Sequence, residues 1–173
     1  MKSTKKIALS AVFCSLSVVL MFFGSATNVL DITCAGFASL IILLANIEIG
    51  TSYSLLIYFV VGTLSFILLP DKFCDVCYIG FIGWYPIAKN YIERIKSNIA
   101  VWTVKIVLFN ISLALIISAS VFILSDNNFK TLWIIIAGVV ISNVAFVLFD
   151  IALTRLISLY YFKYRNRFKK FFG

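Results

Sequence analysis

The sequence predicts an all-α integral membrane protein, a six-transmembrane-helix bundle with both termini in the cytoplasm. Of its 173 residues, 62% are hydrophobic and only 13% are charged, and the mean hydropathy is +1.07. Soluble domains carry about 25% charged residues. Apolar runs also recur along the chain, and six spans of roughly 20 residues each leave only short connections and a tail. We therefore treat residues 1–173 as a single membrane domain with no room for a soluble catalytic domain.

The orientation follows from the distribution of Lys and Arg, which are enriched in cytoplasmic loops. On this topology only Lys72 and Lys130 face outward, while Lys105 and Arg155 lie within or at the edge of spans. The cytoplasmic set is Lys2, Lys5, Lys6, Lys89, Arg94, Lys96, Lys163, Arg165, Arg167, Lys169 and Lys170. This bias predicts a multi-pass protein of the cell membrane with its N- and C-termini inside.

The first predicted span covers residues 6–24 and follows a basic N-terminus. A signal peptide begins in the same way, but this apolar run is long for one, which favours an uncleaved span. Ala8, Ala11 and Ser15 fall on one face of the helix, and small side chains allow another helix to approach closely in lipid. Such a face packs inside the bundle or docks a partner protein, and the sequence leaves both open.

The next three predicted spans cover residues 32–47, 52–69 and 74–92, separated by short polar turns. The last of these ends in a basic, amphipathic turn and begins with a C-x-x-C pair, Cys74 and Cys77. Such a pair is typical of a redox centre or of half a metal site. Since the chain has no histidine and no second pair, packing of two small residues one helical turn apart is the plainer interpretation.

The last two predicted spans, residues 99–124 and 131–161, carry charges at membrane depth, Lys105 and Asp150. Intramembrane ionisable residues are costly and default to a functional hypothesis. Adjacent antiparallel helices would bring the two charges together in the inner half, where the pair holds the helices in register. A proton or ion relay would require further acidic groups. The basic, aromatic tail, residues 162–173, is expected to anchor the chain at the cytoplasmic interface or to bind anionic lipid.

A ligand site is predicted at the outer end, where polar residues gather above aromatic ones. This combination suits a small, flat organic solute. The predicted substrate-binding residues are Asn28, Asp31, Asp75, Tyr78, Asn127 and Trp133. The chain has no paired carboxylates at helical spacing and no G-x-S-x-G or H-E-x-x-H motif. We therefore expect no catalytic residues, no cofactor, no metal site and no enzymatic activity.

With its predicted span count, basic start and small-residue face, the chain resembles the substrate-binding S components of energy-coupling factor transporters. The face of Ala8, Ala11 and Ser15 is similar to their A-x-x-x-A motif, and FIGWYPIAKNYIER resembles a G-Y-Y-P-I-x-K pattern of small bacterial membrane proteins, with Trp84 replacing the first Tyr. The resemblance implies binding of a vitamin or related micronutrient from outside. It also implies docking through the first helix onto a transmembrane T subunit that is driven by two ATPase subunits, with no nucleic-acid partner.

Two alternatives remain open at this stage. A non-transporting membrane scaffold, such as the cell-shape protein MreD, would have partner-binding faces but no pocket. A membrane thiol oxidoreductase would use Cys74 and Cys77 and would lose its activity on Cys77→Ser. A concave pocket with converging polar groups would favour transport, and a filled bundle would favour a scaffold.

Overall fold

We analysed a computed structural model of the chain, which describes residues 3–27, 30–70, 72–124 and 132–164. Every element in these ranges is helical, which confirms the predicted all-helical class. The elements are α1 (Ser3–Thr27), α2 (Asp31–Glu48), α3 (Thr51–Leu68), α4 (Lys72–Cys77), the π-helix η1 (Tyr78–Ile82), α5 (Tyr85–Ile92), α6 (Asn98–Leu124), α7 (Leu132–Leu159) and the π-helix η2 (Tyr160–Tyr164). Among the described residues, five helices are long and apolar enough to cross a membrane: α1, α2, α3, α6 and α7.

The predicted span over residues 74–92 is an interrupted helix rather than a continuous one. Gly83 N–H donates to the carbonyl of Tyr78 at 2.9 Å, which is the i→i+5 pattern of a π-helix. Pro86 then lies at the start of α5, where its missing N–H leaves a further gap in the helical hydrogen-bond pattern. The segment therefore consists of α4, η1 and α5 in succession.

Side chains satisfy two backbone carbonyls at this interruption. The Tyr58 hydroxyl of α3 donates to the Ile79 carbonyl at 2.8 Å, and the Trp84 indole N–H donates to the Gly80 carbonyl at 3.0 Å. An apolar environment offers no water to do this, so broken helices at membrane depth depend on such partners. The interruption is thus stabilised by α3 as well as by the segment itself.

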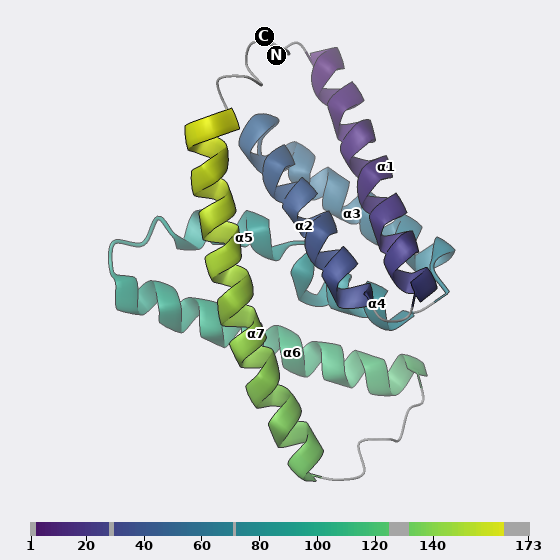
Figure 1. The fold of residues 1–173 in the computed structure, drawn as a ribbon, viewed down its shortest axis with the longest axis vertical. Helices are drawn as coiled ribbons and strands as arrows, with labels where there is room; N and C mark the ends of the chain where they lie inside the picture. The colour runs from purple at the N-terminus through teal and green to yellow at the C-terminus, as the bar shows by residue number, and fades with distance from the viewer. Residues whose placement is uncertain (1–2, 28–29, 71, 125–131, 165–173) are drawn as a thin grey trace.

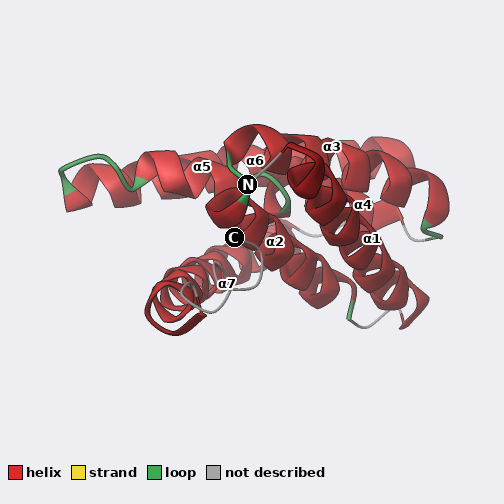
Figure 2. Cartoon of the chain, turned by 90° about the horizontal axis from the view of Figure 1, so that it is seen from above, coloured by secondary structure: helices red, strands yellow, loops and turns green. Residues whose placement is uncertain are grey.

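The helices run in two main directions. Figure 1 shows α1, α2 and α3 side by side, with the segment α4–η1–α5 and α6 running across them. α7 crosses α6 near the middle of both helices, and Figure 2 shows α7 almost end-on. Near the end of α7, the Tyr160 hydroxyl donates to Glu48 Oε1 at 2.6 Å and ties η2 to the end of α2.

Large apolar side chains cover much of the surface of α6 and α7. Ile111, Leu115, Ile141 and Val144 are 54%, 64%, 68% and 58% exposed. Apolar surface in water costs about 25 cal/mol per Å², and soluble monomers rarely expose large contiguous apolar patches. This surface is compatible with insertion in a membrane.

Candidate functional site

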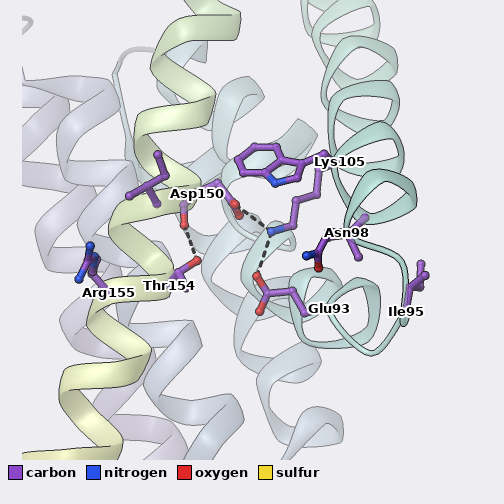
Figure 3. Close-up of a pocket in the computed structure, with 10 residues that line it drawn as sticks. Glu93, Ile95, Asn98, Lys105, Asp150, Thr154 and Arg155 are labelled. Carbon is purple, nitrogen blue, oxygen red and sulfur yellow. Dashed lines mark hydrogen bonds and ion pairs between the residues drawn. The ribbon is translucent and has the colours of Figure 1, made fainter.

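Four charged residues from three elements form a buried charge cluster, defined as Lys89, Glu93, Lys105 and Asp150. Lys105 Nζ lies 2.8 Å from Asp150 Oδ2 and 2.9 Å from Glu93 Oε1, as Figure 3 shows. Lys89 Nζ lies 2.8 Å from Glu93 Oε1 and forms a second ion pair with Asp150 Oδ1. Each lysine therefore contacts both acids, and the cluster joins α5, α6 and α7.

Three members of the charge cluster are enclosed, since Lys89, Lys105 and Asp150 are 0%, 3% and 2% exposed, whereas the Glu93 side chain is 36% exposed. The Tyr85 hydroxyl donates a hydrogen bond to Asp150 Oδ1 at 2.5 Å. Two positive and two negative charges balance, which is the condition under which buried charges are tolerated.

The structure brings together the two intramembrane charges that the sequence singled out, Lys105 and Asp150. It also adds Lys89, which the sequence counted among the cytoplasmic charges, and shows that its side chain is buried against Asp150. The missed signal is the spacing of Tyr85, Lys89 and Glu93, which fall four residues apart. Residues at this spacing share one face of a helix, and this face of α5 points into the cluster.

An aromatic layer, defined as Phe81, Phe109 and Phe146, adjoins the charge cluster. The rings of Phe109 and Phe146 stack at 4.5 Å with an interplanar angle of 6°. Phe81 contacts both edge-on, at 5.1 and 5.5 Å, and stacks on Tyr85 at 4.7 Å. Aromatic pairs in these geometries add about 0.5–1.5 kcal/mol beyond their buried area.

α6 and α7 each contribute one side chain to the aromatic layer and one to the charge cluster. The interrupted segment contributes Phe81 to the aromatic layer and Tyr85, whose hydroxyl is hydrogen-bonded to the charge cluster. The two side chains are always four residues apart: Phe81 with Tyr85, Phe109 with Lys105, and Phe146 with Asp150. Since residues four apart lie over one another on a helix, the same three segments build two adjacent layers. The position of the aromatic layer therefore depends on the ion pairs beside it.

An apolar cavity of about 460 Å³ opens beside the aromatic layer, between α2, the interrupted segment, α6 and α7. Among the described residues, no charged side chain lines it, and Ser142 and Cys77 supply the hydroxyl and the thiol of its lining. Its lining residues are Ile32, Gly36, Phe73, Cys77, Phe81, Ile82, Phe109, Leu113, Ile116, Ile117, Gly138, Val139, Ser142, Ala145, Phe146 and Phe149. Its size lies within the roughly 300–1,000 Å³ that is usual for small-molecule sites.

A smaller polar cavity, of about 330 Å³, lies beside the charge cluster and is drawn in Figure 3. Glu93, Lys105, Asp150 and Arg155 line it together with polar and apolar residues of α6 and α7. Lys105 Nζ also lies 5.4 Å from the centre of the Trp102 ring, a cation–π contact. The charged groups that face this cavity are mostly paired with one another already.

The predicted substrate-binding residues are not brought together around the apolar cavity. Asp75 and Tyr78 are buried within the helix packing and Asp31 is half-buried, and none of the three lines this cavity. Asn28 and Asn127 lie outside the described residues, and Trp133 belongs to α7. The apolar cavity is lined in part by five phenylalanines, whereas the prediction combined polar residues at the outer end with Tyr78 and Trp133 just inside.

The small-residue face of α1 is turned away from the protein interior. Ala8, Ala11 and Ser15 are exposed, whereas Leu9 and Phe13 on the opposite side are buried. The sequence left two interpretations of this face open, and its exposure argues against packing inside the described bundle. It is accessible for contact with lipid or with another helix.

The cysteines and acids form no group that could hold a metal ion in the described ranges. Cys74 and Cys77 are thiols rather than a disulfide, and no three His, Cys, Asp or Glu side chains gather there as metal ligands. No protein-family model matches the chain, and neither the curated proteins nor the solved structures include a significant match to it. Arguments about function therefore depend on the site alone.

Proposed function

We propose that the protein is the substrate-binding subunit of a membrane uptake transporter for a vitamin or related small micronutrient, energised by partner ATPases. It acts as a six-span protein of the cell membrane, in which the interrupted segment α4–η1–α5 is the remaining span and both termini are cytoplasmic. On this topology, the charge cluster lies in the inner half and the apolar cavity in the outer half.

The observation that carries this proposal is the apolar cavity of about 460 Å³ beside the aromatic layer. A scaffold protein needs partner-binding faces, whereas a cavity of this size with a largely apolar lining is typical of a small-molecule site. Broken helices beside a cavity are a recurrent way to build binding sites in membrane transporters. Two elements of the interrupted segment, α4 and η1, line the apolar cavity.

The partner contact is assigned to α1. The exposed face of Ala8, Ala11 and Ser15 lets a helix of a transmembrane T subunit approach its backbone closely, because small side chains keep neighbouring backbones near one another in lipid. The chain then supplies substrate recognition, and two ATPase subunits supply the energy through the T subunit.

The charge cluster has a positioning role in this proposal. It fixes the mutual placement of α5, α6 and α7, and with it the aromatic layer that forms one wall of the cavity. Its charges are balanced and mutually paired, which favours a structural clamp over a proton or ion relay.

The test is purification of the tagged full chain from its native membrane, followed by mass spectrometry of the proteins that accompany it. A T subunit and two ATPases are expected with the wild-type chain. Ala11→Trp should reduce their recovery at least about tenfold, which corresponds to about 1.4 kcal/mol, because the indole separates the two backbones.

The matched control is Leu16→Trp, which places the same indole on an exposed position of α1 outside the small-residue face. Leu16 is 49% exposed, so this variant should fold and retain the partners. Equal loss in both variants would contradict docking through the small-residue face. Recovery of cell-wall or division proteins, with no ATPase, would replace uptake with the scaffold alternative.

A further inference from the structure

The apolar cavity has a lining that restricts the chemistry of its ligand. Its walls carry five phenylalanines and no charged side chain. A charged ligand that moved from water or from the headgroup region into the cavity would find no side chain of opposite charge there. Such a transfer is strongly unfavourable at low dielectric. The lining therefore disfavours substrates that carry a carboxylate or a phosphate group into the cavity.

An apolar lining alone does not favour an apolar ligand when the protein is surrounded by lipid. Hydrocarbon chains are as apolar as the cavity, so the hydrophobic effect does not drive transfer from the bilayer into the protein. Selective binding must come from packing and ring geometry. Phe73, Phe81, Phe109, Phe146 and Phe149 offer faces and edges to an aromatic ring, and they offer no comparable advantage to a flexible acyl chain.

The cavity offers very few hydrogen-bonding groups. Ser142 contributes a hydroxyl, and Cys77 contributes a thiol, which is a weak donor. One polar group on the ligand can be satisfied here, and several cannot.

We propose that the apolar cavity binds an uncharged, planar aromatic molecule that carries a single hydrogen-bonding group, placed next to Ser142. This inference rests on the proposed function in one respect, which is that the ligand is the micronutrient taken up. It narrows that micronutrient to a neutral aromatic compound. The ring lies against the aromatic layer, and therefore one helical turn from the charge cluster. Gly138 and Gly36 keep two sides of the cavity open.

The test uses the full chain in lipid nanodiscs and two neutral alcohols as probes, 2-naphthalenemethanol and 1-decanol. Both carry one hydroxyl, but only the first is flat and aromatic. The readout is the rate of alkylation of Cys77, which lines the cavity, by N-ethylmaleimide, resolved from the other cysteines by peptide mass spectrometry. At nine-tenths occupancy the rate should fall about tenfold, because only the unoccupied fraction reacts.

A cavity-filling variant supplies the specificity control. A Cβ built at Gly138 meets no other atom within 4 Å, so Gly138→Phe is expected to occupy the cavity without displacing the backbone. It should abolish saturable protection by 2-naphthalenemethanol, while Val140→Phe, at a neighbouring position that is 58% exposed, should preserve it. Ser142→Ala should weaken the protection and leave the preference for the aromatic probe intact.

Two outcomes would overturn the inference. Equal protection by 1-decanol would mean that the cavity accepts acyl chains, and no saturable protection by either probe would mean that it binds neither. Co-purification of partner ATPases is measured separately on the same wild-type chain. Their presence together with a charged bound compound would leave uptake standing and remove only the neutral aromatic substrate class.

Discussion

Substitution of Asp150 is the sharpest test of the charge cluster. Asp150→Asn preserves the size of the side chain and one acceptor oxygen for Tyr85, but it removes the negative charge shared by Lys89 and Lys105. These two lysines are 0% and 3% exposed and would then share Glu93 alone. Breaking a buried ion pair on one side costs about 3–5 kcal/mol, and we expect a loss of that size in the free energy of unfolding.

The measurement is denaturation of the purified protein in mixed micelles of increasing SDS content, followed by circular dichroism. Lys105→Met alone should also destabilise the protein, because Lys89 is then the only lysine of the cluster left to balance both Asp150 and Glu93. In the double variant Asp150→Asn/Lys105→Met, the pair of Lys89 and Glu93 remains balanced, so the combined loss should be clearly smaller than the sum of the single losses. A loss below about 1 kcal/mol for Asp150→Asn, or strict additivity, would refute the role assigned to the cluster.

Two further predictions concern the interrupted segment and use the same denaturation assay. Tyr58→Phe removes the donor to the Ile79 carbonyl and should cost about 1–3 kcal/mol of unfolding free energy. Tyr91→Phe, at an exposed position, should be neutral. Equal effects of the two substitutions would contradict a stabilising hydrogen bond from α3 to this carbonyl. Gly83→Ala would place its Cβ 2.8–2.9 Å from ring atoms of two tyrosines and should cost about 1–3 kcal/mol, whereas Gly138→Ala meets no atom within 4 Å and should be tolerated. A neutral Gly83→Ala would mean that the rings move aside freely.

Sequence reasoning predicted the helices from the length of the apolar runs, and that signal is local. α1, α2, α3, α6 and α7 lie close to their predicted bounds. The interruption at η1 was not predictable, because it depends on a hydroxyl that α3 brings from more than twenty residues away. A local apolar pattern contains no information about such a partner.

The site was harder to predict than the helices, for two physical reasons. Lys89 was placed with the cytoplasmic charges because a basic run at the end of a span usually lies in solvent, whereas here Asp150 compensates for its burial. The substrate site was sought among polar residues at the outer end, with Tyr78 and Trp133 beside them, because polar groups are the visible signal. Phe109 and Phe146 are inconspicuous in an apolar sequence, and only the crossing of α6 and α7 stacks them.

The central claim is that the cavity of this protein holds a small organic molecule taken up by the cell. Mass spectrometry of the compounds released from the full chain, purified from its native membrane, tests it most directly, with Gly138→Phe purified in parallel. The account predicts one small organic molecule in near-stoichiometric amount from the wild-type protein, and little or none from the variant. The absence of any such molecule from the wild-type protein, or equal amounts from both, would contradict it.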